Sequence, residues 1–397
     1  MPFFNNVELL PEDPILSIPI AFAADTRPQK VNLGVGTYRT ADGAPLILTC
    51  VRKAENQILQ KNLNKEYLPI EGDSEYLNCG LKLLFGPEFT NIDPKNLFAA
   101  QAIGGSGALR IAGEFLSKNI NKNIFLSQPS WPNHKQIFEH AGLNVGSYPY
   151  FDSKTNKLDF KGMCDAIKDM PPTSIILLQG SCHNPTGVDP SFEQWQELSR
   201  LIKQQQLVPL FDQAYQGFGQ NLDKDAEAVR YFAKDGHEMF VCYSFAKNFG
   251  LYGERIGFLA VIASNPDAKL RLASQIKTII RGNYSTPPLH GERIVKTILK
   301  NPELTQEWQT ELENMRDRIK EMRLAFAADL IARGAHENYA FINKQNGLFS
   351  IFGLSQKQVL RLRDEKAIFM PINGRINIAG LTTQNLDYVV ESIVSVL

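Results

Sequence analysis

Short apolar runs rich in β-forming residues alternate with helical patterns between about residues 96 and 262. The runs are "NLFAA" from residue 96, "NIFLS" from 123, "NVGSYPY" from 144, "SIILLQ" from 174, "LVPLF" from 207, "MFVCYS" from 239 and "GFLAVI" from 257. Seven short strands separated by helices predict an α/β layer with a largely parallel sheet. Ligands of such a sheet bind at the strand ends and the loops that follow them.

The pattern changes after residue 303. Apolar residues recur at three- and four-residue spacing from Leu304 to Leu330, and Gly334 follows where a C-cap glycine is expected, which predicts one long amphipathic helix. "FINKQNGLFSIFGL" and "AIFMPINGRINIAGL" then predict short strands, divided by glycine turns, in a smaller α+β unit. The first 14 residues have three prolines and no periodicity, so we expect an arm that lies on another surface.

Composition narrows the class of partner. Lys plus Arg and Asp plus Glu number 42 each, so no global charge attracts nucleic acid or an anionic membrane. The five cysteines form no CxxC pair, which predicts reduced thiols, and no metal site is expected. No Lys or Arg precedes Arg27, unlike a targeting peptide, and no run reaches the ~18 apolar residues of a membrane helix. We expect a soluble, cytoplasmic protein that acts on small molecules.

A lysine follows one of the predicted buried strands, in "YSFAKNFGLYGERIG" at 243–257. Most lone lysines at a strand end lie on the surface; the alternative is that Lys247 is a nucleophilic amine, kept partly deprotonated by burial and cationic neighbours. Ser244 and Arg255 flank it, and a hydroxyl with a bidentate guanidinium suits a phosphate monoester.

Two further side chains follow the strand at 207. Asp212 is either a helix N-cap or the partner of a heteroaromatic nitrogen, which it would keep protonated so that the ring can accept electrons. Tyr215 either packs in the core or donates its phenol to an oxygen on that ring.

Three loops complete the set. Gly104, Gly105, Ser106 and Gly107 form a glycine-rich turn that runs into a helix and can bind phosphate through its N–H groups. Trp131 offers a flat face for stacking, and Asn184, held extended before a proline, offers its amide to a ligand. Each feature alone has a structural explanation, but together they predict pyridoxal phosphate bound covalently to Lys247.

These segments also resemble a known family. In order and spacing, the chain is similar to the class I aminotransferases of the aspartate aminotransferase branch through "VNLGVGTYR", "KEYLPIEG", "GGSGALR", "PSWPNH", "CHNPTG", "FDQAYQGF", "YSFAKNFGLYGERIG", "NYSTPPLHG" and "GRINIAGL". The resemblance runs from about Asn32 to Leu381. It implies fold type I of the pyridoxal-phosphate-dependent transferases, an α/β fold with a mostly parallel seven-stranded sheet in the large domain and a smaller α+β domain. The implied division is an N-terminal arm at 1–14, a small domain from 15–45 and 315–397, and a large cofactor-binding domain at 46–314.

The resemblance assigns a role to each candidate residue. Lys247 would bind the cofactor and move the substrate's proton, Asp212 would pair with the ring nitrogen, and Tyr215 and Asn184 would contact the ring oxygen. Trp131 would stack on the ring. The phosphate would be held by Gly105, Ser106, Ser244, Arg255 and, from a second subunit of a homodimer with shared sites, Tyr67.

Two arginines define the implied substrate. Arg375 would bind the α-carboxylate, assisted by Asn184, and Arg281 of the partner chain would bind a side-chain carboxylate, which selects aspartate, glutamate and their oxo acids. Gly36, Phe349 and Trp131 would line the pocket. Gly104 and Thr286 depart from the usual Ser and Asn of the family, next to the phosphate and the site entrance.

Other functions stay open at this point. An aromatic aminotransferase of the same branch can keep both arginines and also accept tyrosine or phenylalanine. A non-catalytic regulator built on the same body would need a basic DNA-binding domain, but the 30 residues before "VNLGVG" are not basic. A degenerate binding protein is disfavoured because the lysine, the aspartate and both arginines are present.

Overall fold

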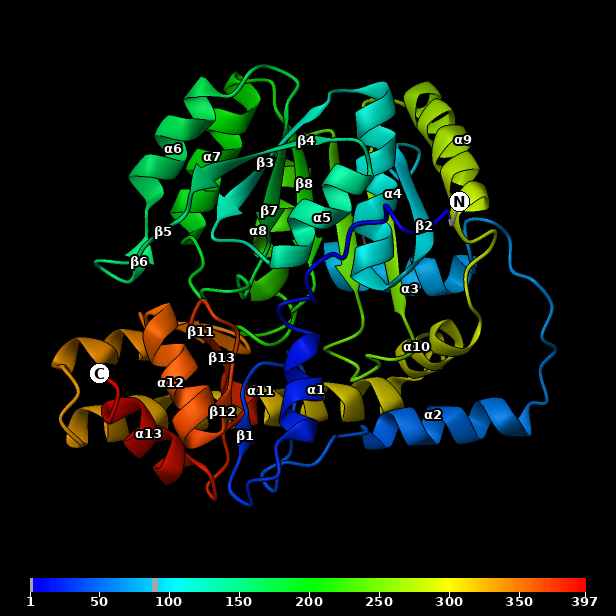
Figure 1. Cartoon of the computed structure of the whole chain (residues 1–397). Coiled ribbons are helices and arrows are strands. Elements are labelled where there is room, and N and C mark those ends of the chain that lie inside the picture. The colour runs from blue at the N-terminus through cyan, green and yellow to red at the C-terminus, as the bar shows by residue number, and fades with distance from the viewer. Residues whose placement is uncertain (1–2, 88–91) are drawn as a thin grey trace.

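A seven-stranded sheet forms the upper part of the molecule in Figure 1, a computed structural model that describes residues 3–87 and 92–397. Its strands lie in the order β2-β10-β9-β8-β7-β3-β4. They are β2 (Leu97–Ile103), β3 (Asn123–Gln128), β4 (Asn144–Pro149), β7 (Ile175–Gln179), β8 (Val208–Gln213), β9 (Met239–Ser244) and β10 (Ile256–Ile262). Only β10 pairs antiparallel with its neighbours, so the seven predicted strands and the mostly parallel sheet are confirmed.

Helices cover both faces of this sheet. Successive residues of a strand point to opposite faces, and in β9 Phe240 and Cys242 join one apolar cluster whereas Val241 and Tyr243 join another. The first face packs against α4 (Gly104–Asn119), α5 (Pro132–His140) and α9 (Pro266–Asn283). The second packs against α3 (Ser74–Phe85), α6 (Phe160–Asp169), α7 (Phe192–Gln204) and α8 (Glu227–Lys234). Because both faces are buried, the strands are almost continuously apolar, which explains why the sequence shows them as short apolar runs.

The long helix predicted from residue 304 is α11 (Pro302–Ala332), which runs along the base of the molecule (Figure 1). Asn301 caps its start, since the side-chain oxygen accepts the N–H groups of Glu303 and Leu304 at 2.9 and 3.2 Å. Gly334 follows its end with φ of +96°, a left-handed conformation that glycine adopts without strain. The helix and its C-cap glycine are therefore as predicted.

Two small sheets lie beside α11 and belong to the lower part of the molecule. β1 (Val31–Asn32) pairs parallel with β12 (Ile368–Phe369), and β11 (Phe349–Ile351) pairs antiparallel with β13 (Arg375–Asn377). The remaining elements are α1 (Ser17–Ala24), α2 (Thr49–Gln60), β5 (Phe151–Asp152), β6 (Lys157–Leu158), α10 (His290–Lys300), α12 (Gln356–Lys366), α13 (Leu386–Val394) and the 3₁₀ helices η1 (Lys224–Ala226), η2 (Glu337–Lys344) and η3 (Ile378–Gly380).

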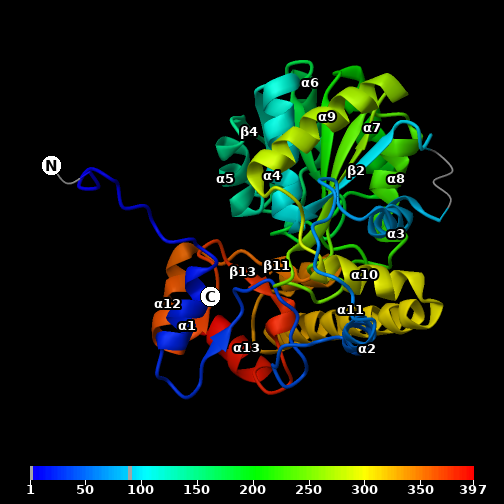
Figure 2. The same ribbon diagram turned by 90° about the vertical axis from the view of Figure 1, so that its right-hand side faces the viewer.

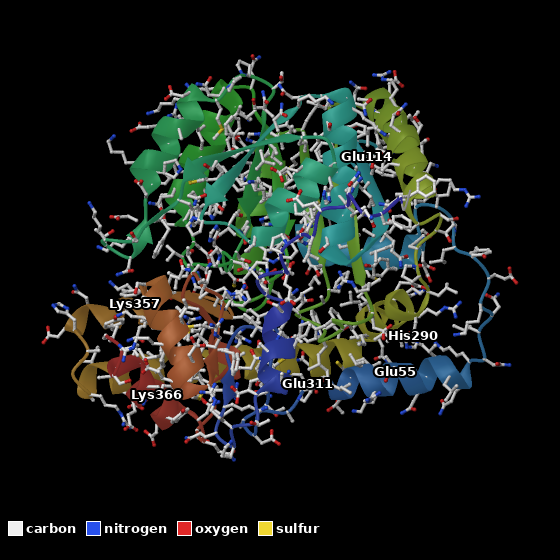
Figure 3. All side chains as sticks on the ribbon, viewed as in Figure 1. Glu55, Glu114, His290, Glu311, Lys357 and Lys366 are labelled. Atoms are coloured by element: carbon white, nitrogen blue, oxygen red, sulfur yellow. The ribbon has the colours of Figure 1, made fainter. Side chains whose placement is uncertain are left out.

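Helix α2 is joined to α11 through its first turn. Both carboxylate oxygens of Glu311 accept backbone N–H groups there, from Thr49 at 2.7 Å and Cys50 at 3.1 Å (Figure 3). A carboxylate at a helix N-terminus satisfies unpaired donors and the helix dipole. The predicted border at 314/315 lies inside α11, and the division into domains stays a prediction.

The N-terminal segment reaches away from the rest of the chain. Figure 2 shows the residues before α1 extending to one side, and Phe3, Phe4, Leu9 and Leu10 are exposed. Of the arm expected at 1–14, residues 1 and 2 lie outside the described residues. No helix in the described part of the chain combines the length and apolarity needed to cross a membrane. The five cysteines are free thiols.

Candidate active site

A cavity of about 250 Å³ opens at the edge of the large sheet where the parallel strands end. Its walls come from the ends of β7, β8 and β9, from the start of α4 and from the small sheet of β11 and β13. The predicted site residues among its lining are Gly36, Gly105, Ser106, Trp131, Asn184, Asp212, Tyr215, Ser244, Lys247, Arg255, Phe349 and Arg375. Residues from eight separate segments of the sequence thus meet in one cavity, at the sheet edge that the sequence predicts.

Lys247 lies in the loop after β9 with its amine inside the cavity, 5.7 Å from the centre of the Tyr215 ring. Burial lowers the pKa of this amine from 10.5 to about 8; the carboxylate of Asp212 opposes the shift, and the guanidinium groups of Arg255 and Arg375 add to it. A useful fraction of the amine is therefore deprotonated near neutral pH, as a nucleophile requires.

Asp212 is the next-to-last residue of β8 and is buried, but it caps no helix, since the next helical element is η1. Its carboxylate lies 2.9 Å from Nε2 of His134, and Nδ1 of His134 lies 2.8 Å from the hydroxyl of Ser130. The fully buried His134 thereby fixes the orientation of the carboxylate on the side away from the cavity. His134 is part of the motif "PSWPNH", but no role for it was predicted from the sequence.

Donors for an anion gather at the start of α4. The helix begins at Gly104, so Gly105 and Ser106 lie in its first turn, where backbone N–H groups lack helical partners. Arg255 is next to them: a Cβ on Gly104 would lie 2.7 Å from its Nη2 atom, so the serine usual in the family would displace this guanidinium. Ser244 is also close to this turn, with its Cβ 3.2 Å from the position of a Cβ on Gly105.

Another part of the cavity wall is built around Arg375 of β13, which is 2% exposed. It donates to Oδ1 of Asn184 at 3.2 Å and to the carbonyl of Gly34 at 2.5 Å, and its guanidinium lies 4.2 Å from the centre of the Phe349 ring. Its Nε has no hydrogen-bond partner among the described residues. A fixed guanidinium with an unused donor is suited to bind a carboxylate.

Asn184 connects Arg375 to Tyr215. Its amide nitrogen lies 3.5 Å from the hydroxyl of Tyr215, while Gln179 holds its backbone through hydrogen bonds of 2.8 and 3.0 Å. Burial raises the pKa of Tyr215, so its hydroxyl stays a proton donor. Gln179, like His134, was not predicted; a signal for it is its position as the last residue of the strand "SIILLQ".

Phe349 closes the cavity beside Gly36. A Cβ on Gly36 would lie 2.7 Å from the tip of the Phe349 ring, so the ring could not keep this position beside a larger residue. Trp131 lies on another wall, just before α5, and its ring meets that of His134 edge to face at 5.1 Å.

Two predicted site residues lie outside the cavity of this chain. Tyr67 follows α2 in an irregular segment and is 89% exposed. Arg281 lies exposed in the last turn of α9, where it donates to the hydroxyl of Ser285. The single chain therefore leaves both side chains available to a second molecule.

The donor set fits a phosphorylated aromatic aldehyde. The cavity is lined by an amine of lowered pKa, by donors for an anion at the start of α4, by a buried carboxylate, by a phenol and by an aromatic ring. These groups match the phosphate, aldehyde, ring nitrogen and ring oxygen of pyridoxal phosphate.

Comparison with known proteins gives consistent results. Residues 28–393 match the model of the family "Aminotransferase class I and II". The aspartate aminotransferase of Escherichia coli K12 is 45% identical over 395 residues, which cover 99% of this chain and 100% of that protein. Among solved structures, the aromatic-amino-acid aminotransferase of Burkholderia pseudomallei, covalently bound to pyridoxal phosphate, has a TM-score of 0.96 and 46% identity, with all of both chains covered. The cytoplasmic aspartate aminotransferase of Saccharomyces cerevisiae has a TM-score of 0.97 and 39% identity, and the match covers 99% of this chain and 98% of that one.

Proposed function

The chain belongs to the class I and II aminotransferases, and we propose that it transfers an amino group reversibly between L-aspartate and 2-oxoglutarate, giving oxaloacetate and L-glutamate. The observation that supports this most is a single cavity whose lining brings together the buried amine of Lys247, an anion site at the start of α4 and the buried guanidinium of Arg375. Fold, family and cavity chemistry agree on a pyridoxal-phosphate-dependent enzyme.

Each residue contributes one interaction to cofactor binding in this proposal. Lys247 is the covalent attachment point; Asp212 pairs with the ring nitrogen, Tyr215 and Asn184 with the ring oxygen, and Trp131 stacks on the ring. Backbone N–H of Gly105 and the side chains of Ser106, Ser244 and Arg255 hold the phosphate. The bound cofactor supplies an electron sink that stabilises a carbanion at the substrate's α-carbon.

Proton transfer is the task of Lys247. When the substrate rather than Lys247 is joined to the cofactor, the free amine of Lys247 would be able to take the substrate's α-proton and to deliver it to the carbon on the other side of the amino nitrogen. The lowered pKa of Lys247 supports this, since a general base works best with a pKa near the working pH. His134 supports Asp212 by holding its carboxylate in one orientation.

Substrate binding would use both arginines. Arg375, with Asn184, binds the α-carboxylate that all amino acids share, and Gly36 leaves room beside it. Arg281 of a second chain binds the side-chain carboxylate of a dicarboxylic substrate. This arrangement requires a homodimer with shared sites, to which Tyr67 adds a phosphate contact; the exposure of Tyr67 and Arg281 supports it. We further propose that the enzyme is cytoplasmic, which its reduced cysteines support.

A second candidate is an aromatic-amino-acid aminotransferase of the same family. The likeness to the Burkholderia pseudomallei enzyme favours it, at 46% identity compared with 45% for the aspartate aminotransferase of Escherichia coli K12. Both candidates use the same cofactor residues and Arg375, and they differ in the side chain that the site accepts.

Absorbance spectra separate the candidates. The purified protein should absorb in the visible range through its Lys247-bound cofactor, and this band should disappear on addition of an amino acid that transfers its amino group. Loss of the band with aspartate and glutamate at low concentration, but with tyrosine only at high concentration, supports the aspartate enzyme. The reverse order supports the aromatic enzyme, and a band that no amino acid changes contradicts both.

A further inference from the structure

A second buried arginine, Arg323, contacts the backbone of Phe349, which lines the cavity. Arg323 belongs to α11 and is 3% exposed. No carboxylate in the described ranges 3–87 and 92–397 forms an ion pair with it. Burial lowers the pKa of Arg323 to about 10, which still leaves it charged at neutral pH. A buried charge without a counter-ion is costly unless other groups solvate it.

The groups that solvate Arg323 all come from one short segment, residues 347–350. Its Nη2 donates to the carbonyl of Gly347 at 2.5 Å and its Nη1 donates to the hydroxyl of Ser350. Both nitrogens also approach the carbonyl of Phe349, at 3.4 and 3.5 Å. One guanidinium therefore holds the backbone on both sides of Phe349.

Phe349 carries this constraint into the cavity. Its ring supports the guanidinium of Arg375 at 4.2 Å and meets the Tyr215 ring edge to face at 5.9 Å. A Cβ on Gly36 would lie 2.7 Å from the same ring, so the ring has little space on that side. A shift of the backbone at 347–350 would move the surface on which Arg375 rests.

We propose that Arg323 is a positioning residue that fixes Phe349 beneath Arg375 and thereby sets the affinity of the site for the substrate's α-carboxylate. This inference rests on the proposed function of Arg375 and concerns a residue that touches neither substrate nor cofactor. The backbone carbonyls that Arg323 binds would turn toward other partners without it, and Phe349 would lose its single position. A displacement of about 1 Å in a binding group commonly costs up to a hundredfold in rate or affinity.

The test compares two arginines of the same helix. Arg323→Met removes the charge and all donors at nearly constant length, and Arg318→Met is the matched control, because Arg318 also donates to two carbonyls, those of Leu381 at 2.6 Å and Ala379 at 3.4 Å, which lie outside 347–350. Calorimetry measures the dissociation constant of succinate, a dicarboxylate that cannot react, for both cofactor-loaded variants and the wild type. Steady-state kinetics give KM and kcat with aspartate and with phenylalanine.

We expect the dissociation constant of succinate and the KM of both amino acids to rise about ten- to a hundredfold in Arg323→Met, because all three ligands use Arg375. The cofactor's dissociation constant and all values of Arg318→Met should stay near those of the wild type. Arg323→Lys, which keeps the charge but lacks the planar fork, should fall between. If Arg323→Met does not accumulate as folded protein, Arg323→Lys and Ser350→Ala are measured instead. Both should show smaller increases in the dissociation constant of succinate and in the KM of the two amino acids.

Two results would overturn the inference. One is a lower melting temperature of Arg323→Met with succinate affinity and KM no worse than those of Arg318→Met, which would make Arg323 a purely structural residue. The other is a crystal structure of the variant with Phe349 and Arg375 unmoved. A wild type that transfers no amino group from any amino acid contradicts the proposed function instead, and the crystal structure then still decides the role of Arg323.

Discussion

Arg375 and Arg281 would bind the two ends of one substrate, yet the single chain buries the first and leaves the second exposed. Arg375 is buried, held by Asn184 and the carbonyl of Gly34, and supported by the Phe349 ring. Arg281 is exposed at the end of α9 with one hydrogen-bond partner, Ser285, among the described residues. The group that we propose to bind the invariant α-carboxylate is thus built into the fold of a single chain.

The difference has a physical reason. A buried arginine must be solvated by fixed partners, and that suits a ligand group that is the same in every substrate. An arginine that the single chain leaves exposed would take its place only when a second chain completes the site, and it would contact a ligand group that varies between substrates. We therefore expect substitutions in the buried half of the site, which contains Lys247, Asp212 and Arg375, to lower the activity on all substrates. Substitutions of Arg281 should lower the activity on only some of them.

The largest loss of activity should follow from replacing Lys247 in the buried half of the site. Lys247→Ala should bind pyridoxal phosphate without a covalent link and lose amino transfer by about ten-thousandfold or more, since no amine remains to move the proton. Borohydride reduction followed by peptide mapping should label wild-type protein at Lys247. Label on any other lysine would contradict the assignment, and the unreduced wild type carried through the same mapping is the control.

Asp212→Asn should break the same half without removing the covalent link. The amide cannot favour a protonated ring nitrogen, so we expect the covalent link to form but single turnovers with aspartate to slow about a thousandfold, or ~4 kcal/mol at ~1.4 kcal/mol per factor of ten. Phenylalanine should slow equally. A near-normal rate would leave Asp212 with only the structural contact to His134.

Arg281→Leu tests the exposed half directly. Removing the partner of a substrate carboxylate in a desolvated site should cost about 3–5 kcal/mol, or a few hundredfold or more in kcat/KM for aspartate and glutamate. Phenylalanine lacks that carboxylate, so its kcat/KM should hold or rise. Arg375→Leu is the matched control, with losses on both substrates.

Two outcomes of this experiment would change the proposed function. Equal losses on aspartate and phenylalanine in Arg281→Leu would remove Arg281 from the specificity site. A wild type already faster on phenylalanine than on aspartate would favour the aromatic-amino-acid aminotransferase.

Mixed dimers sharpen the claim that Arg281 acts in another chain. A Lys247→Ala chain and a Tyr67→Phe/Arg281→Leu chain should each be poor alone, but one of the two sites in their heterodimer would contain intact residues from both. Co-refolding with two different affinity tags isolates that species, and its activity should approach half that of the wild type. Heterodimers no better than either parent would show that all these residues act within one chain.

The sequence predicted those parts of the fold that extend over many residues. Buried strands such as "SIILLQ" and the apolar face from Leu304 to Leu330 repeat a signal often enough to be recognised. The two-residue strand β1 does not repeat such a signal. Its partner β12 lies in "AIFMPINGRINIAGL", where short strands were predicted, but the pairing joins residues more than 300 positions apart.

Within the site, the chain order and spacing of the motifs identified which residues converge, but not how they are oriented. His134 is an unremarkable residue in "PSWPNH" until the fold brings it to Asp212, 78 residues later. Arg323 has the spacing of the apolar face of α11 but a charged side chain, and only the tertiary structure explains its burial. For Asp212, the sequence left a helix cap open as an alternative, and the structure excludes it because no helix begins there.

The smallest expected effect is a pH dependence of the free energy of unfolding of the cofactor-free protein. Burial, together with Arg255 and Arg375 and against Asp212, lowers the pKa of Lys247 from 10.5 to about 8 in the folded chain, whereas the unfolded chain keeps the ordinary value. Between these values the unfolded state binds more protons, so the contribution of Lys247 to the free energy of unfolding must rise with pH in that window. From pH 8 to pH 9 the rise should be about 1 kcal/mol. Denaturant unfolding of wild type and Lys247→Met at both pH values measures it, because titration of other groups largely cancels in the difference. A difference that does not change with pH would mean that the amine is solvated in the folded protein, and would place Lys247 with Arg281 among the exposed cations of the site.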